Sequence, residues 1–335
     1  MKYKSVIVTQ KGSPEVLKVV ENDLRAPLTG EARIKILATS VGRTDIGYRK
    51  GDLSFAPKIP FVPGYEILGG VDAVGEGVTN VAVGDRVAAL IGHGGYSEYV
   101  YLGKEHLVQV PATLDPAEAV TLILNYTSAY QMLHRTAKVK AGDKVLIIGA
   151  SGGVGTALLQ LGKLAGLSMY GTASPSKHNI LTELGATPID YHTQDLIDVI
   201  HRAEPNGLDF VFDGVGGEYA KIGLEVLGKG GKLVEYTPAP GGPGAIALLA
   251  WLILVNLMML PNRKSIKGYG ISALYRTNKR PFMDDLPVLF NLLREGKIKP
   301  IIAKKFPILE AAQANVLLES GKVTGNVVLL APELL

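Results

Sequence analysis

The chain has 335 residues, and none of them is cysteine. Disulfide bonds, catalysis by a thiolate and cysteine-ligated metals are therefore excluded. Histidine is also scarce, because only positions 93, 106, 134, 178, 192 and 201 carry it, with no HxxxH spacing or similar pair. A catalytic zinc needs about three protein ligands, so we expect no metal in this protein.

Charge favours neither sign strongly. The 35 basic residues oppose 31 acidic ones, and no run of basic residues is interleaved with aromatic residues. We therefore expect no nucleic-acid partner. The first ten residues alternate like a short strand and lack the profile of a cleavable signal peptide, so we expect a cytoplasmic location. The length is sufficient for two domains.

A glycine-rich turn between a strand and a helix is the most informative feature that is present. Residues 144–148 form an apolar strand, glycines follow at 149, 152, 153 and 155, and residues 156–165 continue as a helix. Glycines let a backbone approach a pyrophosphate closely, and the helix directs the positive end of its dipole at the phosphates. Because the strand and the helix are both in place, the turn favours dinucleotide binding over ordinary loop closure.

The first 125 residues and the segment after them differ in their predicted secondary structure. Up to about residue 125, short predicted strands are separated by turns, which is typical of an all-β or barrel-like domain; they lie at 32–38, 67–74 and 85–91. From about 126 to 265, strands alternate with helices, which predicts a doubly wound parallel sheet of the α/β class. The strands after the first helix are expected at 167–172, 208–213 and 231–236.

The end of the chain returns to shorter elements. Helices are predicted at 284–295 and 309–319, and the strand 326–330 closes the chain. We expect this last strand to rejoin the sheet of the first domain.

Further motifs accompany the glycine turn: Pro63–Glu66, Val71–Val78, Val83–Val87, Gly94–Val100, Leu184–Tyr191 and Phe212–Gly217. Together they resemble the medium-chain dehydrogenase/reductase superfamily, and within it the zinc-independent quinone oxidoreductase-like branch. The resemblance spans essentially the whole chain. It implies a GroES-like β-barrel domain formed by residues 1–125 and 266–335, a Rossmann NADPH-binding domain over 126–265, and a homodimer.

Two departures from zinc-dependent relatives bear on the chemistry. The segment that supplies a cysteine ligand in those relatives reads Gly42-Arg-Thr-Asp45, and the segment that supplies a histidine reads Gly64-Tyr65-Glu66. Two ligand positions are thus occupied by Gly42 and Tyr65. Without a Lewis acid, reducing a simple ketone is difficult, whereas a conjugated carbonyl or a quinone accepts hydride more readily.

The cofactor is predicted from the end of the second Rossmann strand. An NAD enzyme normally has an acidic residue about 20 residues beyond the glycine turn. This chain has Ser174, Ser176 and Lys177 there and no carboxylate, so we expect NADPH rather than NADH. Zinc-free relatives use a lysine and a tyrosine at the positions of Lys177 and Tyr191 for the 2′-phosphate. The resemblance places the cofactor against Ser128, Ser151, Gly152, Gly153, Val154, Gly155, Ser174, Lys177, Tyr191, Asp213, Gly214, Tyr236 and Asn326, although many relatives carry a basic residue at the last position.

The catalytic residues are less well defined. Hydride transfer to an enone or quinone leaves an anion that needs stabilisation and a proton. The candidates are Tyr48, Tyr65, Asn125 and Tyr126, with Asn125 expected to open the helix that the family packs against the nicotinamide. Leu53 occupies a position where many relatives have a tyrosine. Each candidate could instead simply line the domain junction.

The apolar segment 245–260 has no parallel elsewhere in the chain. The segment has 16 residues and would span about 24 Å as a helix. A membrane-spanning helix needs roughly 20 residues, so the segment is too short to cross a bilayer. A buried core helix, a dimer-interface helix, a lid over a lipophilic substrate and a helix resting on a membrane surface all remain open. We hypothesise that the segment contributes to a site for a lipophilic small-molecule substrate.

These expectations describe an NADPH-dependent, zinc-free reductase of quinones or α,β-unsaturated carbonyls. The alternatives are a 2-enoyl-thioester reductase acting on CoA or acyl-carrier thioesters, and a non-catalytic NADPH-binding protein.

Overall fold

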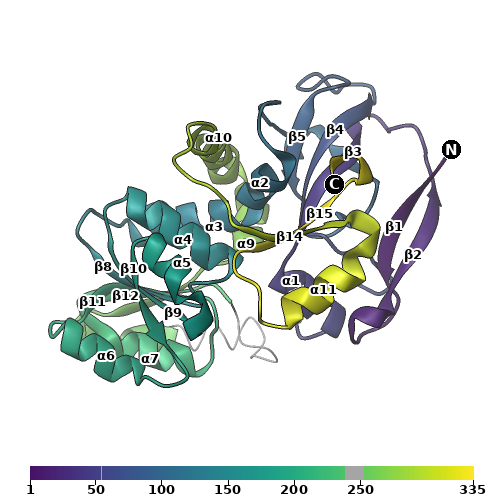
Figure 1. Ribbon diagram of the computed structural model, residues 1–335. Helices are drawn as coiled ribbons and strands as arrows, with labels where there is room; N and C mark the ends of the chain where they lie inside the picture. Colours follow the sequence, from purple (N-terminus) through teal and green to yellow (C-terminus); the bar gives the residue numbers. More distant parts are fainter. Residues whose placement is uncertain (54, 238–252) are drawn as a thin grey trace. The chain divides into compact units, whose positions relative to one another are not determined.

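The computed structural model describes residues 1–53, 55–237 and 253–335. Two compact units divide the chain: unit 1 contains Met1–Thr127 and Lys279–Leu335, and unit 2 contains Ser128–Asn278. The coloured ribbon shows that both ends of the chain belong to unit 1 (Figure 1).

Unit 2 is built on a parallel sheet in the order β10-β9-β8-β11-β12-β13. Its strands are β8 (Lys144–Ile148), β9 (Ser168–Ala173), β10 (Ala186–Asp190), β11 (Leu208–Asp213), β12 (Leu227–Glu235) and β13 (Ser265–Gly268). Numbered within this sheet, the order is 3-2-1-4-5-6, which is the doubly wound arrangement. Successive strands are added to one side of β8 up to β10 and to its other side from β11 onward, so the strand order switches between β8 and β11. Ligands of such sheets bind at the carboxyl ends of the strands beside that switch.

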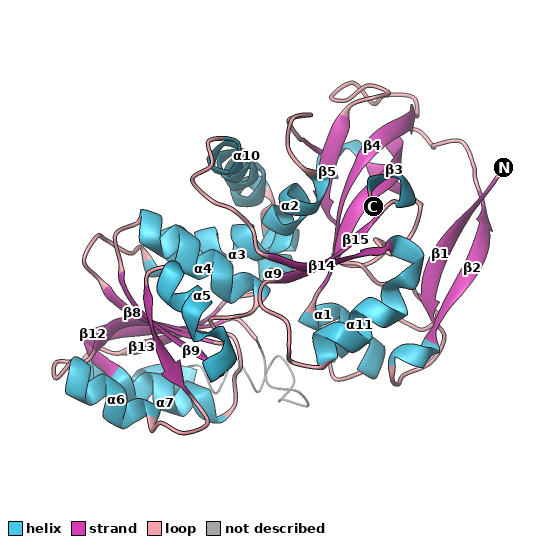
Figure 2. Ribbon diagram, viewed as in Figure 1, coloured by secondary structure: helices cyan, strands magenta, loops and turns pink. Residues whose placement is uncertain are grey.

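Helices cover both faces of this sheet. Figure 2 shows α4 (Gly153–Leu164) and α5 (His178–Glu183) on one face, and α6 (Leu196–Ala203) and α7 (Glu218–Val226) on the other. Leu146, Val211 and Leu233 are fully buried and belong to the core that forms between the sheet and its helices. The near-continuous apolar strands reflect this burial on both faces. A further helix, α9 (Ile271–Thr277), follows β13.

The main sheet of unit 1 has the order β14-β15-β3-β4-β5-β7, with β6 also paired to β3. The strands are β3 (Glu31–Val41), β4 (Glu66–Val74), β5 (Arg86–Leu90), β6 (Tyr99–Gly103), β7 (Val108–Gln109), β14 (Ile302–Pro307) and β15 (Asn326–Leu330), and β1 (Lys2–Val8) and β2 (Leu17–Asp23) form a separate hairpin. Every residue of β15 is buried, and the strand pairs antiparallel with β3. The expectation that the last strand rejoins the first domain is confirmed.

The α-helices of unit 1 come from both of its chain segments. They are α1 (Arg43–Lys50), α2 (Pro116–Thr121), α10 (Arg280–Arg294) and α11 (Ala311–Glu319). Both α2 and α11 contact β3 and β15. The expected helices at 284–295 and 309–319 correspond to α10 and α11.

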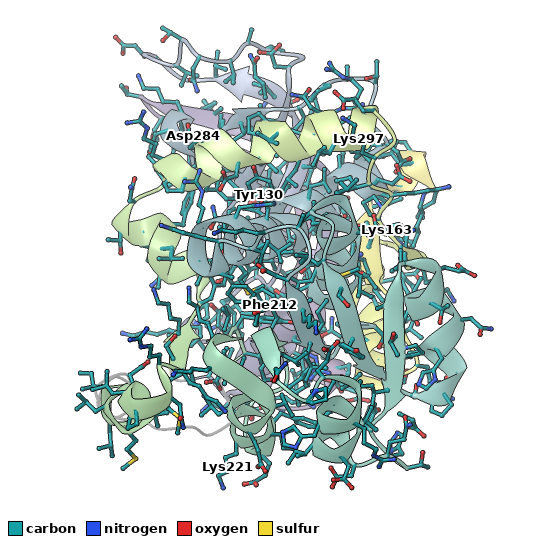
Figure 3. All side chains as sticks on the ribbon, turned by 90° about the vertical axis from the view of Figure 1, so that its left-hand side faces the viewer. Tyr130, Lys163, Phe212, Lys221, Asp284 and Lys297 are labelled. Carbon is teal, nitrogen blue, oxygen red and sulfur yellow. The ribbon has the colours of Figure 1, made fainter. Side chains whose placement is uncertain are left out.

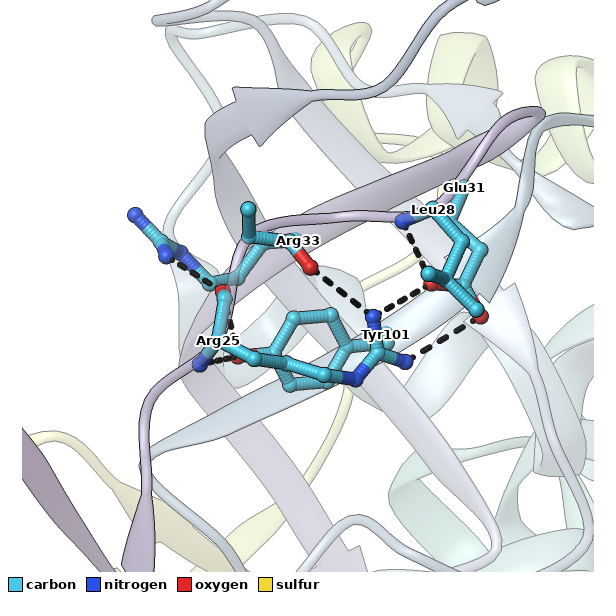
Figure 4. A network of polar contacts seen from close by, with 6 residues as sticks. Arg25, Leu28, Glu31, Arg33 and Tyr101 are labelled. Carbon is cyan, nitrogen blue, oxygen red and sulfur yellow. Dashed lines mark hydrogen bonds and ion pairs between the residues drawn. The ribbon is translucent and has the colours of Figure 1, made fainter.

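A polar network fixes the loop between β2 and β3 to the neighbouring strand β6 (Figure 4). The guanidinium of Arg25 lies 4.0 Å from the centre of the Tyr101 ring, and its Nη1 donates to Glu31 Oε2 at 2.7 Å. Tyr101 Oη donates to the carbonyl oxygen of Arg25 at 2.9 Å, and Arg33 Nη1 donates to the same oxygen at 2.8 Å. Arg25 is exposed and the other groups are partly buried, and all of them bond within the loop and its neighbouring strands, so we assign them a structural role in holding the loop.

The helical run that contains Asn125 begins earlier than expected. It starts at Pro116, where Asp115 accepts hydrogen bonds from the backbone N–H groups of Ala117 and Glu118. It continues through the π-helical segment η3 (Leu122–Tyr126), α3 (Thr127–Tyr130) and the π-helical segment η4 (Gln131–Ala137). Asn125 therefore lies inside the helical run and does not open it.

The second boundary between the units also differs from the expected one. We expected unit 2 to end at residue 265, but β13 adds to its sheet by pairing in parallel with β12, and α9 follows within the same unit. The return to unit 1 therefore falls at Lys279.

The apolar segment 245–260 is described only in its last part. Residues 238–252, including Trp251, lie outside the described residues, whereas residues 253–259 are helical. Among the described residues, every helix is too short or too polar to span a membrane.

Candidate active site

The glycine turn after β8 is tied to the neighbouring strand. The N–H of Gly149 donates to Thr172 Oγ1 at 2.9 Å, and the N–H of Ala150 donates to the carbonyl oxygen of Thr172 at 3.1 Å. Gly149 adopts a φ of 81°, in the left-handed region that glycine enters without steric cost. The turn between β8 and α4 is thus held in one shape by β9.

Gly155 is required because the helix passes close to the turn. A Cβ at this position would lie 2.4 Å from the carbonyl oxygen of Gly149 and 2.6 Å from that of Ala150. At Gly152 the nearest atom would lie 3.6 Å away, which is an ordinary contact. The third glycine of the dinucleotide fingerprint has this packing role between helix and strand.

The N-terminus of α4 offers donors for an anion. The helix begins at Gly153 with Gly152 as its N-cap, and the first bond of the ladder to Gly152 comes from Thr156 N at 2.8 Å. The N–H groups of the first turn have no acceptor within a helix, and the helix dipole adds positive potential there. The predicted residues Ser151, Gly152, Gly153, Val154 and Gly155 therefore lie together at a helix end suited to phosphate.

Two loops at the same edge of the sheet carry the residues predicted for the 2′-phosphate. β9 and β10 are parallel and end side by side, with Ala173 opposite Asp190. Ser174 and Lys177 follow β9, and Tyr191 follows β10 as an exposed side chain. Because both loops leave the carboxyl ends of adjacent strands, the structure brings these residues to one corner of the sheet.

The Asp190 carboxylate is occupied by its own loop. It accepts hydrogen bonds from the backbone N–H of His192 at 3.0 Å and from Thr193 Oγ1 at 2.6 Å. The Thr193 hydroxyl, followed by this N–H, lowers the pKa of Asp190. The carboxylate is thus engaged in shaping the Tyr191 loop.

On the other side of the switch in strand order, β11 and β12 each end in a residue with a carboxylate side chain. Asp213 lies opposite Glu235 in the parallel register. Asp213 Oδ1 accepts from the N–H groups of Val215 and Gly216, whereas its buried Oδ2 has no hydrogen-bond partner among the described residues. Burial, and then the Asp213 charge, raise the pKa of Glu235 to about 7, and burial also raises the pKa of Asp213.

Tyr236 lies directly over the next residue of the β11 loop. A Cβ on Gly214 would come 2.3 Å from Tyr236 Oη, so a side chain at position 214 would force the tip of the ring to shift. Asp213, Gly214 and Tyr236 are therefore brought together as predicted residues of one strand-end cluster. An unpaired buried acceptor such as Asp213 Oδ2 is suited to a hydroxyl donor from a ligand.

These features fit a dinucleotide. A close backbone approach, a helix N-terminus and hydrogen-bonding groups at the ends of consecutive parallel strands are the components of such a site. Ser128, predicted for the same site, is buried in α3 at the start of unit 2.

In unit 1, one carboxylate joins the two segments where zinc-dependent relatives carry ligands. Asp45 Oδ2 accepts from the N–H of Gly42, and Asp45 Oδ1 accepts from the N–H of Gly64, both at 2.9 Å. Burial raises the pKa of Asp45 to about 6. Within residues 1–53, 55–237 and 253–335, no cluster of three or more histidine, aspartate or glutamate side chains is arranged to hold a metal ion.

Glu66 is a second buried carboxyl group, two residues after Gly64, which bonds to Asp45. The Ser40 hydroxyl donates to its Oε1, and its Oε2 is buried without a hydrogen-bond partner in the described part of the chain. Burial raises the pKa of Glu66 to about 8, and the charge of Asp45 contributes in the same direction.

The raised pKa of Glu66 predicts a stability that falls with rising pH. Between its ordinary pKa of 4.5 and about 8, the folded chain retains a proton that the unfolded chain releases. The free energy of unfolding then decreases by on the order of 1 kcal/mol per pH unit. Glu66→Gln removes this dependence, so urea unfolding at pH 5, 7 and 9 should show a flatter profile for the variant. Exposed Glu76→Gln is the matched control, and identical profiles for Glu66→Gln and the native chain would refute the burial argument.

The structure brings two of the catalytic candidates together within unit 1. The rings of Tyr48 and Tyr65 are buried with centres 6.2 Å apart, and Tyr48 also contacts Phe55 and Phe61 edge-on. This aromatic cluster could not be predicted from the sequence, because Tyr48 lies in α1 and Tyr65 directly precedes β4, and only the fold brings them together.

The other two candidates adopt different environments. Asn125 Nδ2 donates to Asn326 Oδ1 at 2.7 Å, and Asn326 Nδ2 donates in turn to the carbonyl oxygen of Ile301 at 3.0 Å. Tyr126 is fully buried, its Oη has no partner among the described residues, and burial raises its pKa. Asn125 is therefore held in an amide chain, whereas Tyr126 is enclosed in the core.

Sequence reasoning missed Thr172, Glu235, Asp45 and Glu66 as site residues. Thr172 directly follows Gly171 in β9, and an acidic residue at the end of each of β11 and β12 was visible in the sequence. Asp45 and Glu66 lay inside motifs that we read only for their missing metal ligands. The sheet pairing placed Thr172 and Glu235 beside the predicted residues, whereas the environments of Asp45 and Glu66 arise from tertiary packing.

Comparison with known proteins agrees with this architecture. Residues 29–112 match the family model described as alcohol dehydrogenase GroES-like domain, and residues 184–329 match the one described as zinc-binding dehydrogenase. The expected pairing of a GroES-like domain with a Rossmann domain is confirmed.

Individual relatives cover nearly the whole chain. The quinone oxidoreductase of Sus scrofa is 31% identical over 97% of this chain and 97% of its own length. The synaptic vesicle membrane protein VAT-1 homolog of Rattus norvegicus is 34% identical over 91% of this chain and 78% of its own length. A mycobacterial protein solved in complex with NADPH superposes with a TM-score of 0.86 at 27% identity, covering 98% of this chain and 99% of the other. The chain therefore belongs to the medium-chain dehydrogenase/reductase superfamily and is quinone oxidoreductase-like.

Proposed function

We propose that this protein is an NADPH-dependent reductase that transfers hydride to quinones or α,β-unsaturated carbonyls without zinc. The observation that carries the proposal is the end of β9, where Ser174 and Lys177 occupy the place of the acidic residue that NAD enzymes use. The family assignment supplies the reaction class, which is oxidoreduction.

The choice of NADPH rests on charge and position. Lys177 provides a cation at the corner of the sheet where the ribose end of a dinucleotide binds, and no carboxylate at the end of β9 repels a phosphate there. Tyr191 is exposed on the adjacent loop, after the parallel neighbour β10. The structural relative bound to NADPH supports the same choice.

Different parts of the site would bind different parts of the cofactor. The glycine turn and the N-terminus of α4 would hold the pyrophosphate, and Asp213 Oδ2 would accept a hydrogen bond from a ribose hydroxyl. When bound, NADPH supplies the hydride. Gly214 keeps the space that Tyr236 fills beside that site.

A metal-free reaction is supported by the residues at the former ligand positions. Gly42 has no side-chain donor, and Tyr65 is packed against Tyr48. Asp45 joins the two segments through backbone N–H groups. An acceptor that is already activated by conjugation needs no Lewis acid, and relatives named quinone oxidoreductase agree with this acceptor class.

Stabilisation of the product anion is assigned to Asn125 and the tyrosine pair. An amide nitrogen carries two N–H bonds, so Asn125 can serve Asn326 and an acceptor oxygen together. Tyr65 and Tyr48 would each offer a hydroxyl hydrogen to the oxygen on which the negative charge develops. Tyr126 is left out of the proposed machinery, because its hydroxyl is enclosed in the core of unit 1.

The acceptor class can be tested by following NADPH absorbance at 340 nm with a panel of quinones, enones and an enoyl-CoA. We expect turnover on quinones or free enones. Turnover on the enoyl-CoA alone would favour a 2-enoyl-thioester reductase. Tight NADPH binding without turnover on any acceptor would favour a non-catalytic NADPH-binding protein.

A further inference from the structure

Two asparagine side chains of unit 1 form a hydrogen-bonded chain that ends on a backbone carbonyl group. Asn125 Nδ2 donates to Asn326 Oδ1 at 2.7 Å, and Asn326 Nδ2 donates to the carbonyl oxygen of Ile301 at 3.0 Å. Asn125 lies in η3, whereas Asn326 is the first residue of β15 and is 3% exposed. We call this arrangement the amide chain.

The absence of a side chain at Gly325 allows the Ile301 carbonyl group to lie close to Asn326. A Cβ at Gly325 would lie 2.3 Å from this carbonyl oxygen, and Gly325 has a φ of 78°, in the left-handed region that favours glycine. The same oxygen also accepts from the backbone N–H of Asn326 at 2.9 Å. Because a carbonyl oxygen has two lone pairs, Asn326 occupies both acceptor positions of Ile301.

The direction of both side-chain hydrogen bonds follows from the carbonyl group at the end of the amide chain. A backbone carbonyl oxygen can only accept, so Asn326 must turn its NH₂ group toward Ile301. Its Oδ1 then faces Asn125, which must donate to it through Nδ2. A flipped Asn326 amide would place its oxygen against the Ile301 oxygen in a buried position, where unpaired polar groups are costly. The Ile301 carbonyl group therefore sets the orientation of the Asn125 amide through Asn326.

The backbone that carries Asn125 is fixed independently. The Thr127 hydroxyl donates to the carbonyl oxygen of Leu122 at 2.8 Å, and the backbone N–H of Thr127 donates to the same oxygen. The segment η3 also contacts α10, the helix that Figure 3 shows between the labelled Asp284 and Lys297. With the backbone held, rotation of the side chain is the freedom that remains, and the amide chain removes it.

We propose that Asn326 is a positioning residue, which holds the Asn125 amide with its second N–H directed at the oxygen of the hydride acceptor. This role rests on the proposed function, in which Asn125 stabilises the product anion. Among the residues that the structure describes, Asn125 Nδ2 bonds only to Asn326, and the Asn125 side chain is partly exposed. A donor oriented before the reaction stabilises developing charge without the cost of reorganisation.

The resemblance predicts a different role for Asn326, which is direct contact with the cofactor. The amide chain uses Oδ1 and one of the two side-chain N–H bonds of Asn326, and the residue is buried. A side chain so engaged is better suited to act through its neighbour. The two roles differ in their kinetics, because a direct contact supports cofactor binding, whereas a positioning residue supports the reaction step.

Kinetics of single and double variants of the full chain test the proposal, with NADPH and the acceptor that the native chain reduces fastest. Asn125→Ala should lower kcat by about a hundredfold, as expected for the loss of one donor to a developing anion. Asn326→Leu, which has nearly the shape of asparagine, should lower kcat at least about tenfold through misplacement of Asn125. Its KM for NADPH should not change, and the double variant should be no slower than Asn125→Ala.

Asn22→Ala is the matched control, because it removes a partly buried amide that donates to Ser5 Oγ at 2.9 Å between β2 and β1. Its kcat should equal that of the native chain. Losses of kcat that multiply in the double variant would overturn the proposal. A higher KM for NADPH with an unchanged kcat in Asn326→Leu would also overturn it and would assign Asn326 to the cofactor.

Urea unfolding of the same variants separates this proposal from the proposed function. Absence of turnover by the native chain on every acceptor would contradict the proposed function but leave the amide chain to be measured. The loss of stability in the double variant should be smaller than the sum of the two single losses, because each single variant leaves its partner unpaired. Additive losses would overturn the proposal whatever the activity. Asn326→Ser, whose hydroxyl can still donate to Ile301, replaces Asn326→Leu in both measurements if circular dichroism shows the latter unfolded.

Discussion

Gly155→Ala should abolish tight NADPH binding and destabilise the fold, although it adds a single methyl group. The new Cβ would lie 2.4 Å and 2.6 Å from two backbone carbonyl oxygens of the turn. Backbone atoms cannot rotate away as a flexible side chain can, so the helix and the turn must separate. We expect a loss of about 1–3 kcal/mol in unfolding free energy. The NADPH dissociation constant should rise by about a hundredfold or more, because the phosphate donors move with the helix end.

Gly152→Ala provides a control within the same turn. Its Cβ would lie 3.6 Å from the nearest atom, and Gly152 has a φ of −78°, which alanine adopts without strain. Thermal unfolding of the protein without cofactor should therefore be close to that of the native chain. Equal melting temperatures and NADPH affinities for Gly155→Ala and the native chain would refute the close approach of α4 to the turn.

Lys177→Glu should change cofactor preference more than any other single substitution of the site. A carboxylate at the end of β9 would repel a 2′-phosphate and provide the acidic group that holds a ribose diol. Loss of a charge-assisted contact is worth about 1.5–3 kcal/mol, so the KM for NADPH should rise roughly tenfold to 150-fold. The KM for NADH should stay within a few-fold or fall.

Lys163→Glu changes the net charge of the chain equally without touching this corner. Lys163 is exposed on α4, where its Nζ donates to the carbonyl oxygen of Glu183. Steady-state kinetics with both cofactors should leave this control close to the native chain. Equal rises in the KM for NADPH in both variants would show a general effect of charge and contradict a phosphate site at Lys177.

The sequence predicted those parts of the fold that depend on local pattern. The glycine turn and the alternation of strands and helices after residue 126 follow from periodicity and motif context. The start of the helical run at Pro116 could have been predicted as well, because Asp115 followed by proline is a helix N-terminus signal. The prediction that the helix opens at Asn125 was therefore wrong.

Pairings across the fold could not be predicted, since they depend on strand register. The opposition of Asp213 and Glu235 follows from the register of β11 against β12, and the hydrogen bond from the N–H of Gly64 to Asp45 arises from tertiary packing of two separate segments. β13 is a short strand whose residues carry little strand signal, which is why unit 2 extends beyond the expected boundary. Burial, which sets the pKa values of the carboxyl groups, likewise arises only from tertiary packing.

The most direct test of the central claim is the rate of acceptor reduction with NADPH and with NADH in the presence of EDTA. We predict that the native chain reduces a quinone or an enone with NADPH, that EDTA leaves the rate unchanged, and that kcat/KM with NADH is at least about tenfold lower, as expected for one charged contact to the 2′-phosphate. A rate abolished by EDTA and restored by zinc, or an equal kcat/KM with NADH, would contradict a metal-free NADPH reductase.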